Sequence, residues 1–122
     1  ALGLETVEFQ VDLLYNSPLE EQAADLLEIV EQGREAEEMI IELTNRYMKQ
    51  DLAGLWELMQ KDSEPEELEK LVYSRNRNWT AQMKEIMPAT PTMFVVGAGH
   101  LPGEQGLIKL LEQEGYKLEP VW

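Results

Sequence analysis

The sequence predicts an α/β fold in which a small, mainly parallel, three-stranded sheet is covered by about six helices. Three observations predict it. Five stretches between residues 19 and 87 repeat apolar residues at helical spacing, the chain after Pro91 reads as strand, turn, helix and strand, and the first residues are strand-like. Two strands joined by a helix favour parallel pairing with a right-handed crossover. At 122 residues the chain has the length of a single domain.

The first three helices are expected over residues 19–30, 36–47 and 52–59, where apolar side chains recur every three or four positions. Gly33 supplies a stop after the first of them, and Asp51 is a candidate N-cap for the third. Each of these helices is amphipathic, with its Glu-rich side expected to face solvent.

Two further helices follow. Ser63 and Glu66 stand at capping-box spacing and predict the start of a fourth helix, while residues 79–87 carry the apolar stripe of a fifth. The fifth helix must end near Pro88, because the residue before a proline disfavours the helical region. The Met and Trp residues of these stripes are expected to lie in the core.

Three strands are expected over residues 2–6, 92–96 and 116–121, with the last helix inside residues 103–115. So few strands make a thin sheet whose edge lacks a neighbour. We therefore expect a homo-oligomer that pairs through an exposed sheet edge or a helix face.

The chain is strongly acidic. Asp and Glu outnumber Lys and Arg 24 to 10, which gives a formal net charge of −14. Such a charge repels phosphate backbones and anionic head groups, so we expect no nucleic-acid partner. No stretch approaches the roughly 20 apolar residues of a membrane-spanning helix. The lack of cysteine excludes disulfide bonds and thiolate metal ligands.

The stretch VVGAGHLPGEQG (95–106) holds His100, the only histidine of the chain. Ligands of open α/β sheets bind beyond the carboxyl ends of strands, and His100 follows such an end. Gly97 and Gly99 are candidate cofactor-binding residues because they allow close backbone approach or positive φ. The alternative is a tight turn that needs glycine and carries a surface histidine by chance. The spacing fits neither a Rossmann motif nor a P-loop.

Two other polar groups are candidates for a site. Glu5 stands in the first expected strand, where an acidic side chain is unfavourable unless it lies at an edge or serves a site. Arg75 and Asn76, within SRNRNW, could bind a carboxylate or a carbonyl. The alternative for this pair is a helix cap with surface charge.

Together and in this order, GLETVEFQ, SPLEEQ, RNRNW and FVVGAGHLPGEQGLIKLLEQEGYKLEPV resemble the TraB/PrgY/GumN family, which also contains the Tiki metalloproteases. The resemblance implies a Gly-x-x-His motif from Gly97 to His100, with His100 as a ligand to a divalent metal such as Mn, Co or Zn. It implies that Glu5 is a second ligand or general base, and that Arg75 and Asn76 hold substrate or the developing oxyanion.

The family also carries an earlier Gly-x-x-His motif upstream of its LE segment, and this sequence has none. We therefore expect the carboxyl-terminal half of a larger GumN-like fold, cut at its amino terminus. The resemblance implies a metal-dependent peptidase in the intact protein; alone, this chain is expected to be inactive and to bind no metal tightly. The alternative is a non-catalytic peptide-binding or regulatory protein. Family members are often exported or membrane-associated, which suggests a bacterial cell-envelope location.

Overall fold

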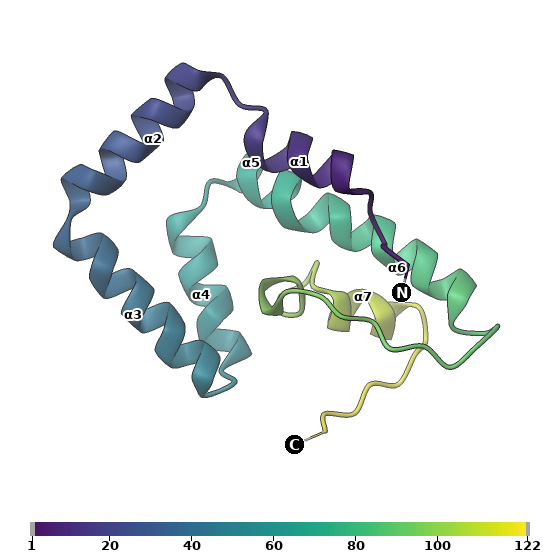
Figure 1. Ribbon diagram of the computed structural model, residues 1–122. Helices are drawn as coiled ribbons and strands as arrows, with labels where there is room; N and C mark the ends of the chain where they lie inside the picture. The colour runs from purple at the N-terminus through teal and green to yellow at the C-terminus, as the bar shows by residue number, and fades with distance from the viewer. Residues whose placement is uncertain (1, 122) are drawn as a thin grey trace. The chain divides into compact units, whose positions relative to one another are not determined.

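The computed structural model describes residues 2–121, and all regular structure in that range is helical (Figure 1). The elements in chain order are α1 (Val7–Tyr15), α2 (Leu19–Gln32), α3 (Arg34–Met48), α4 (Leu52–Asp62), α5 (Pro65–Leu68), the π-helix η1 (Glu69–Tyr73), α6 (Ser74–Ile86), the 3₁₀-helix η2 (Ala98–His100) and α7 (Leu107–Gln113). The chain divides into a first unit that ends at Asn45 and a second unit that begins at Arg46.

The expected α/β fold is wrong, because residues 2–121 contain no strand. Residues 2–6 lead into α1, and residues 92–96 and 116–121 have no regular structure. Within residues 92–96, Phe94 and Val96 are half-buried whereas Met93 and Val95 are exposed. Alternating burial produces the period-two pattern of a strand, but a strand also needs a neighbour to complete its hydrogen bonds, and the pattern does not provide one.

The helical part of the prediction is largely confirmed. α2, α3 and α4 lie where the periodicity places them, and Gly33 is the C-cap of α2. The Asp51 carboxylate caps α4 by accepting a hydrogen bond from the Gly54 backbone N–H at 2.9 Å. α1 was not predicted; its N-cap is Thr6, whose hydroxyl accepts from the Phe9 N–H at 3.1 Å.

The expected start of the fourth helix and its separation from the fifth are both wrong. Ser63 is the C-cap of α4, and the next helix begins at Pro65 with Glu64 as its N-cap. From there α5, η1 and α6 follow without interruption as one helical run, which includes the π-helical turn (Figure 1). Because Pro65 already has the φ that a first helical turn requires, it supplies the start that the capping-box pattern placed at Ser63.

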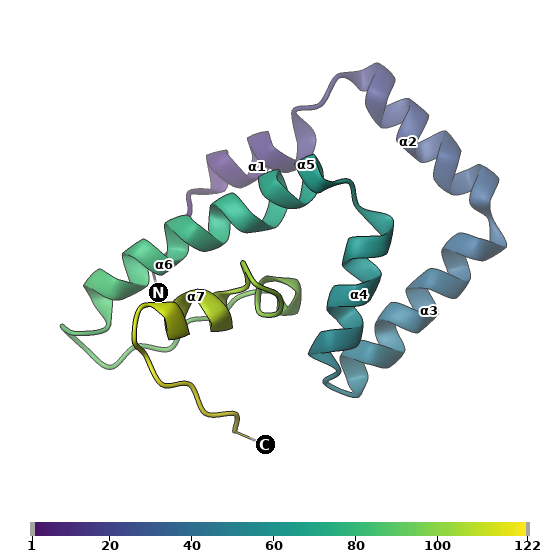
Figure 2. The same ribbon diagram turned by 180° about the vertical axis from the view of Figure 1, so that it is seen from behind.

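The core lies in the second unit. Its buried apolar side chains are Leu55, Leu68, Val72, Trp79, Met83 and Leu107. α6 contacts α7, and η2 contacts both α4 and η1 (Figure 1 and Figure 2). Full burial of one such side chain contributes about 1.5–3 kcal/mol. These contacts hold the loop that carries His100 against α4 and the run from α5 to α6.

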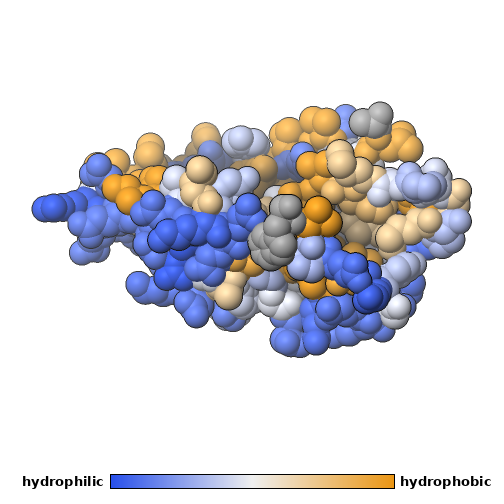
Figure 3. All heavy atoms as spheres, turned by 90° about the horizontal axis from the view of Figure 1, so that it is seen from below, coloured by the Kyte–Doolittle hydropathy of each residue, from blue (hydrophilic) through white to orange (hydrophobic). Residues whose placement is uncertain are grey.

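The first unit has no comparable core. None of its described residues is buried, although α2 and α3 each carry an apolar face. Apolar side chains reach the surface in the space-filling view (Figure 3).

Among residues 2–121, no helix combines the length and the apolar character that crossing a bilayer requires.

Candidate functional site

The site is built on the Gly-His loop, by which we mean residues 97–106. Gly97 is the N-cap of η2, and its carbonyl accepts from the His100 N–H at 3.0 Å. The chain then turns so that the Gly106 N–H donates to the Gly103 carbonyl at 3.0 Å, and α7 begins. These short-range bonds close two tight turns in ten residues and leave the His100 ring half-buried.

Asn76 of α6 attaches the Gly-His loop to the helix. Its side-chain Nδ2 donates to the His100 carbonyl at 3.1 Å and to the Gln105 carbonyl at 2.8 Å. Its Oδ1 lies 2.7 Å from Nδ1 of the His100 ring. Asn76 has no exposed surface, and its own carbonyl accepts from the Thr80 hydroxyl at 2.8 Å. A single buried amide therefore binds both the backbone and the ring of His100.

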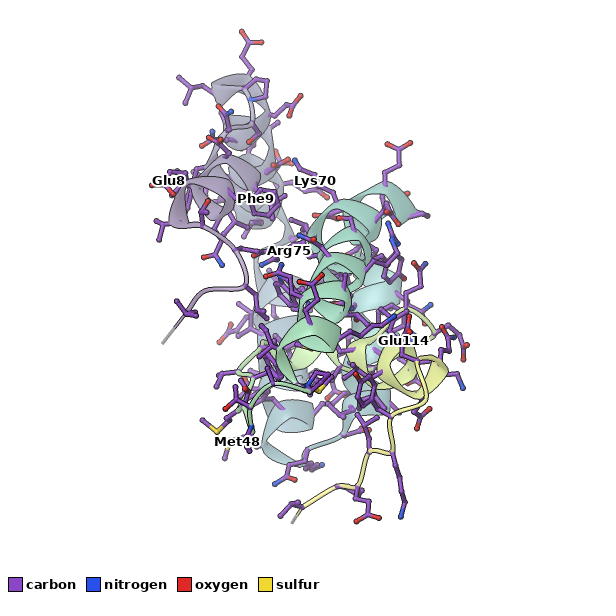
Figure 4. The ribbon with its side chains drawn as sticks, turned by 90° about the vertical axis from the view of Figure 1, so that its right-hand side faces the viewer. Glu8, Phe9, Met48, Lys70, Arg75 and Glu114 are labelled. Carbon is purple, nitrogen blue, oxygen red and sulfur yellow. The ribbon has the colours of Figure 1, made fainter. Side chains whose placement is uncertain are left out.

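Trp79 places a second constraint on the histidine. Its ring centroid lies 4.5 Å from that of His100, with the planes inclined at 43°. Arg75, one turn earlier on α6 (Figure 4), holds its guanidinium carbon 4.9 Å from the centroid of the Trp79 ring and donates to the Leu71 carbonyl at 3.0 Å. Arg75 and His100 thus both contact the same indole, which joins two of the predicted site residues.

The glycines of the Gly-His loop differ in their backbone conformation and in the atoms that a side chain would meet. A Cβ on Gly99 would lie 2.9 Å from the sulfur of Met59, so the close approach expected there is to α4. Positive φ occurs at Gly103, where φ is +88° and a Cβ would lie 2.7 Å from the Trp56 ring. Gly97 has a φ of −65°, which any residue adopts. Cofactor binding by Gly97 and Gly99 stays a prediction.

A comparison with known families identifies the chain. The sequence model of the TraB/PrgY/gumN family matches residues 1–120. The chain belongs to the TraB/PrgY/gumN family. No curated protein and no solved structure matches it. The family resemblance seen in the sequence is confirmed, and the match extends over Glu5, Arg75, Asn76 and His100.

In this TraB/PrgY/gumN chain, Glu5 stands just before the first helix. Glu5 is half-buried as a residue, and its carboxylate accepts from the Gln10 side-chain amide at 3.3 Å. It belongs to the first unit, whereas Arg75, Asn76 and His100 belong to the second. A shared site of Glu5 and His100 stays a prediction.

Whether a metal ion fits this site depends on how many His, Cys, Asp or Glu side chains could coordinate it. Residues 2–121 contain no group of three or more His, Cys, Asp or Glu side chains that could hold an ion. A catalytic zinc site normally uses three protein ligands. His100 suits the role of one such ligand, because metal-binding histidines commonly hydrogen-bond an oxygen through the other ring nitrogen. The described part of this TraB/PrgY/gumN chain therefore fits one ligand, and it does not fit a complete metal site.

Sequence reasoning missed Trp79 and Arg77 as parts of the site. Trp79 was assigned to the core, although it follows Arg75 by four residues and Asn76 by three, and so shares their helix face. Arg77 pairs with Glu69 and donates to the Gln105 side-chain carbonyl at 2.7 Å. The hydrogen bond to Glu69 raises the pKa of the Arg77 guanidinium. Arg77 thus holds the Gly-His loop from the solvent side while Asn76 holds it from within.

Proposed function

We propose that the chain forms the carboxyl-terminal part of a GumN-like, metal-dependent peptidase and provides His100 as one ligand of its metal. The single observation that carries this proposal is the 2.7 Å contact of His100 Nδ1 with the buried Asn76 amide. An imidazole held at one nitrogen by a second residue keeps its other edge in a fixed direction, as metal ligands require. Family membership supports the same role.

Mn²⁺, Co²⁺ or Zn²⁺ would supply Lewis-acid chemistry for peptide hydrolysis. The chain itself would orient the imidazole through Asn76 and Trp79. The Arg75 guanidinium would bind a carbonyl or carboxylate of a peptide substrate. Glu5 would act as a second ligand or as a general base. Since the remaining ligands would come from outside this sequence, we expect no peptidase activity from these residues alone.

The test is calorimetric titration of the chain with Zn²⁺, Co²⁺ and Mn²⁺. We expect weak binding that disappears in His100→Ala. Glu104→Ala removes an exposed carboxylate from the same loop and is the control for non-specific binding to this acidic chain. Metal affinity that is equal in wild type and His100→Ala would contradict the ligand role. A full-length protein that binds peptides but never cleaves them with any of these metals would favour a non-catalytic binding or regulatory function.

A further inference from the structure

We infer that Asn76 selects the Nδ1–H tautomer of His100, and so makes Nε2 the nitrogen that can accept a metal or a proton. The buried Asn76 side chain makes three polar contacts, to the His100 carbonyl, the Gln105 carbonyl and the His100 ring. Asn76 is then a positioning residue, which acts through His100.

The first step is the orientation of the amide. Nδ2 lies 3.1 and 2.8 Å from two backbone carbonyl oxygens, which only accept hydrogen bonds. A flipped amide would place its own oxygen against both carbonyls, leaving three acceptors together and no donor. The amide nitrogen therefore faces the carbonyls and uses both of its hydrogens there.

The second step is the tautomer. With its nitrogen committed, Asn76 presents Oδ1 to the His100 ring at 2.7 Å, and an amide oxygen can only accept. Nδ1 must then carry a hydrogen. A neutral imidazole has only one N–H, so the lone pair is on Nε2. The opposite tautomer would set two lone pairs against each other at a part-buried contact, which is unfavourable because neither atom then has a donor.

The third step is the rigidity of the arrangement. The amide that binds the His100 ring also binds the His100 carbonyl, so ring and backbone are fixed by the same side chain. Trp79 is only 5% exposed, and its ring centroid lies 4.5 Å from that of the imidazole. Asn76 and Trp79 project from the same helix, α6, which packs on α7. The direction of Nε2 is therefore set by α6.

The tautomer is a property of the chain itself, whereas the use of Nε2 by a metal rests on the proposed function. The experiment separates the two. Because His100 is the only histidine, a chain labelled with ¹⁵N-histidine gives one pair of imidazole nitrogen signals. A long-range ¹H–¹⁵N correlation spectrum, recorded where the ring is neutral, reports which nitrogen carries the hydrogen. We expect a protonated Nδ1 and an unprotonated Nε2 in wild type.

The variants test the cause. Asn76→Ala removes the acceptor and should give a mixture of tautomers. Asn78→Ala, exposed on the same helix, is the matched control and should resemble wild type. A folded Asn76→Ala chain with an unchanged tautomer would overturn the inference. If that variant does not fold, the wild-type spectrum decides, and an Nε2–H tautomer or a mixture there overturns it.

Addition of Zn²⁺ to the same samples follows the proposed function separately. A zinc-induced shift of the Nε2 signal in wild type, and its loss in Asn76→Ala, would support both proposals. An Nδ1–H tautomer without any zinc-induced shift would contradict the metal-ligand role and still support the role of Asn76.

Discussion

The two units of the chain are built from the same kind of amphipathic helix but bury very different amounts of it. Through Asn45 no described residue is buried, and Leu26 of α2 is 63% exposed. Among residues 2–121, the buried apolar side chains all lie from Arg46 onward, and they include Leu107 at 2% exposure. The second unit differs because its helices meet elements distant in sequence, such as α6 and α7. Helical periodicity shows which face is apolar; burial depends on a partner for that face.

The charge is divided as unevenly as the core. Residues 1–45 contain 12 acidic residues and 1 basic residue, so they carry −11 of the net charge of −14. The remaining residues contain 12 acidic and 9 basic ones, and here the ions can pair, as Arg77 and Glu69 do. Unbalanced carboxylates repel one another along a helix. Arg75, Asn76 and His100 thus lie in the unit whose charges and apolar faces are matched, whereas Glu5 lies in the other unit.

The largest expected difference between the units is in core truncation. Leu107→Ala removes a buried side chain and should lower the free energy of unfolding by about 2–5 kcal/mol. At a concentration where the chain is monomeric, Leu26→Ala shortens an exposed side chain of the same type and should change this free energy by no more than about 0.5 kcal/mol. Urea titration followed by circular dichroism gives both values. Equal losses would show that the first unit buries α2 as fully as the second buries α7.

The Gly-His loop provides a sharper test within the second unit. A Cβ on Gly106 would lie 2.1 Å from the Pro102 carbonyl oxygen and 2.3 Å from that of Leu101. Gly106→Ala should therefore destabilise the chain by about 1–3 kcal/mol, the usual range for overpacking. Gly97→Ala meets only the His100 ring edge at 3.7 Å and should cost no more than about 0.5 kcal/mol. Thermal melts of both variants check this order, and equal melting temperatures would show that the turn is loosely packed.

The exposed apolar faces of the first unit predict self-association. With no sheet edge in the described residues, α2 and α3 offer the helix faces through which we propose that a second copy pairs. Two such acidic units repel each other, so added salt should strengthen the pairing by screening. Multi-angle light scattering at low and high salt checks this. A monomer at every concentration and salt level would count against it.

The smallest expected effect is a pH dependence from Tyr73. Burial, with the Glu69 carboxylate as a second cause, raises the pKa of the Tyr73 phenol. The folded chain therefore holds this proton more tightly than the unfolded chain, whose tyrosines titrate near pH 10. This contribution to stability is complete below about pH 10 and is lost as pH rises through the folded pKa. Tyr73→Phe should flatten the loss in alkaline urea titrations, and Tyr47→Phe, at an exposed phenol, should not.

The sequence predicted the parts of this fold that depend on nearby residues. Gly33 and Asp51 end and begin helices as expected, because caps act over three or four positions. The strand expected at residues 92–96 does not form, because a strand needs a second strand elsewhere in the chain to complete its hydrogen bonds. The helix start predicted at Ser63 was wrong for a local reason, since Pro65 offers a competing helix start two residues later.

The candidate site also combines features that nearby residues determine with contacts between distant residues. Arg75, Asn76 and His100 could be chosen from residue type and motif, and the structure joins Asn76 to His100 directly and Arg75 to His100 through Trp79. Their mutual arrangement spans 24 residues of sequence between Asn76 and His100. No spacing rule covers such a distance, so the contact of Trp79 with the imidazole could not be predicted from the pattern RNRNW alone.

Residue-resolved amide hydrogen exchange, at a concentration where the chain is monomeric, tests most directly whether the second unit is the stable scaffold of the site. We expect slow exchange in α6 and α7 and at the His100 and Gly106 amides, whose hydrogen bonds close the loop. We expect fast exchange throughout α1 and α2. Protection in α1 and α2 equal to that in α6, or fast exchange at His100 and Gly106, would contradict this expectation.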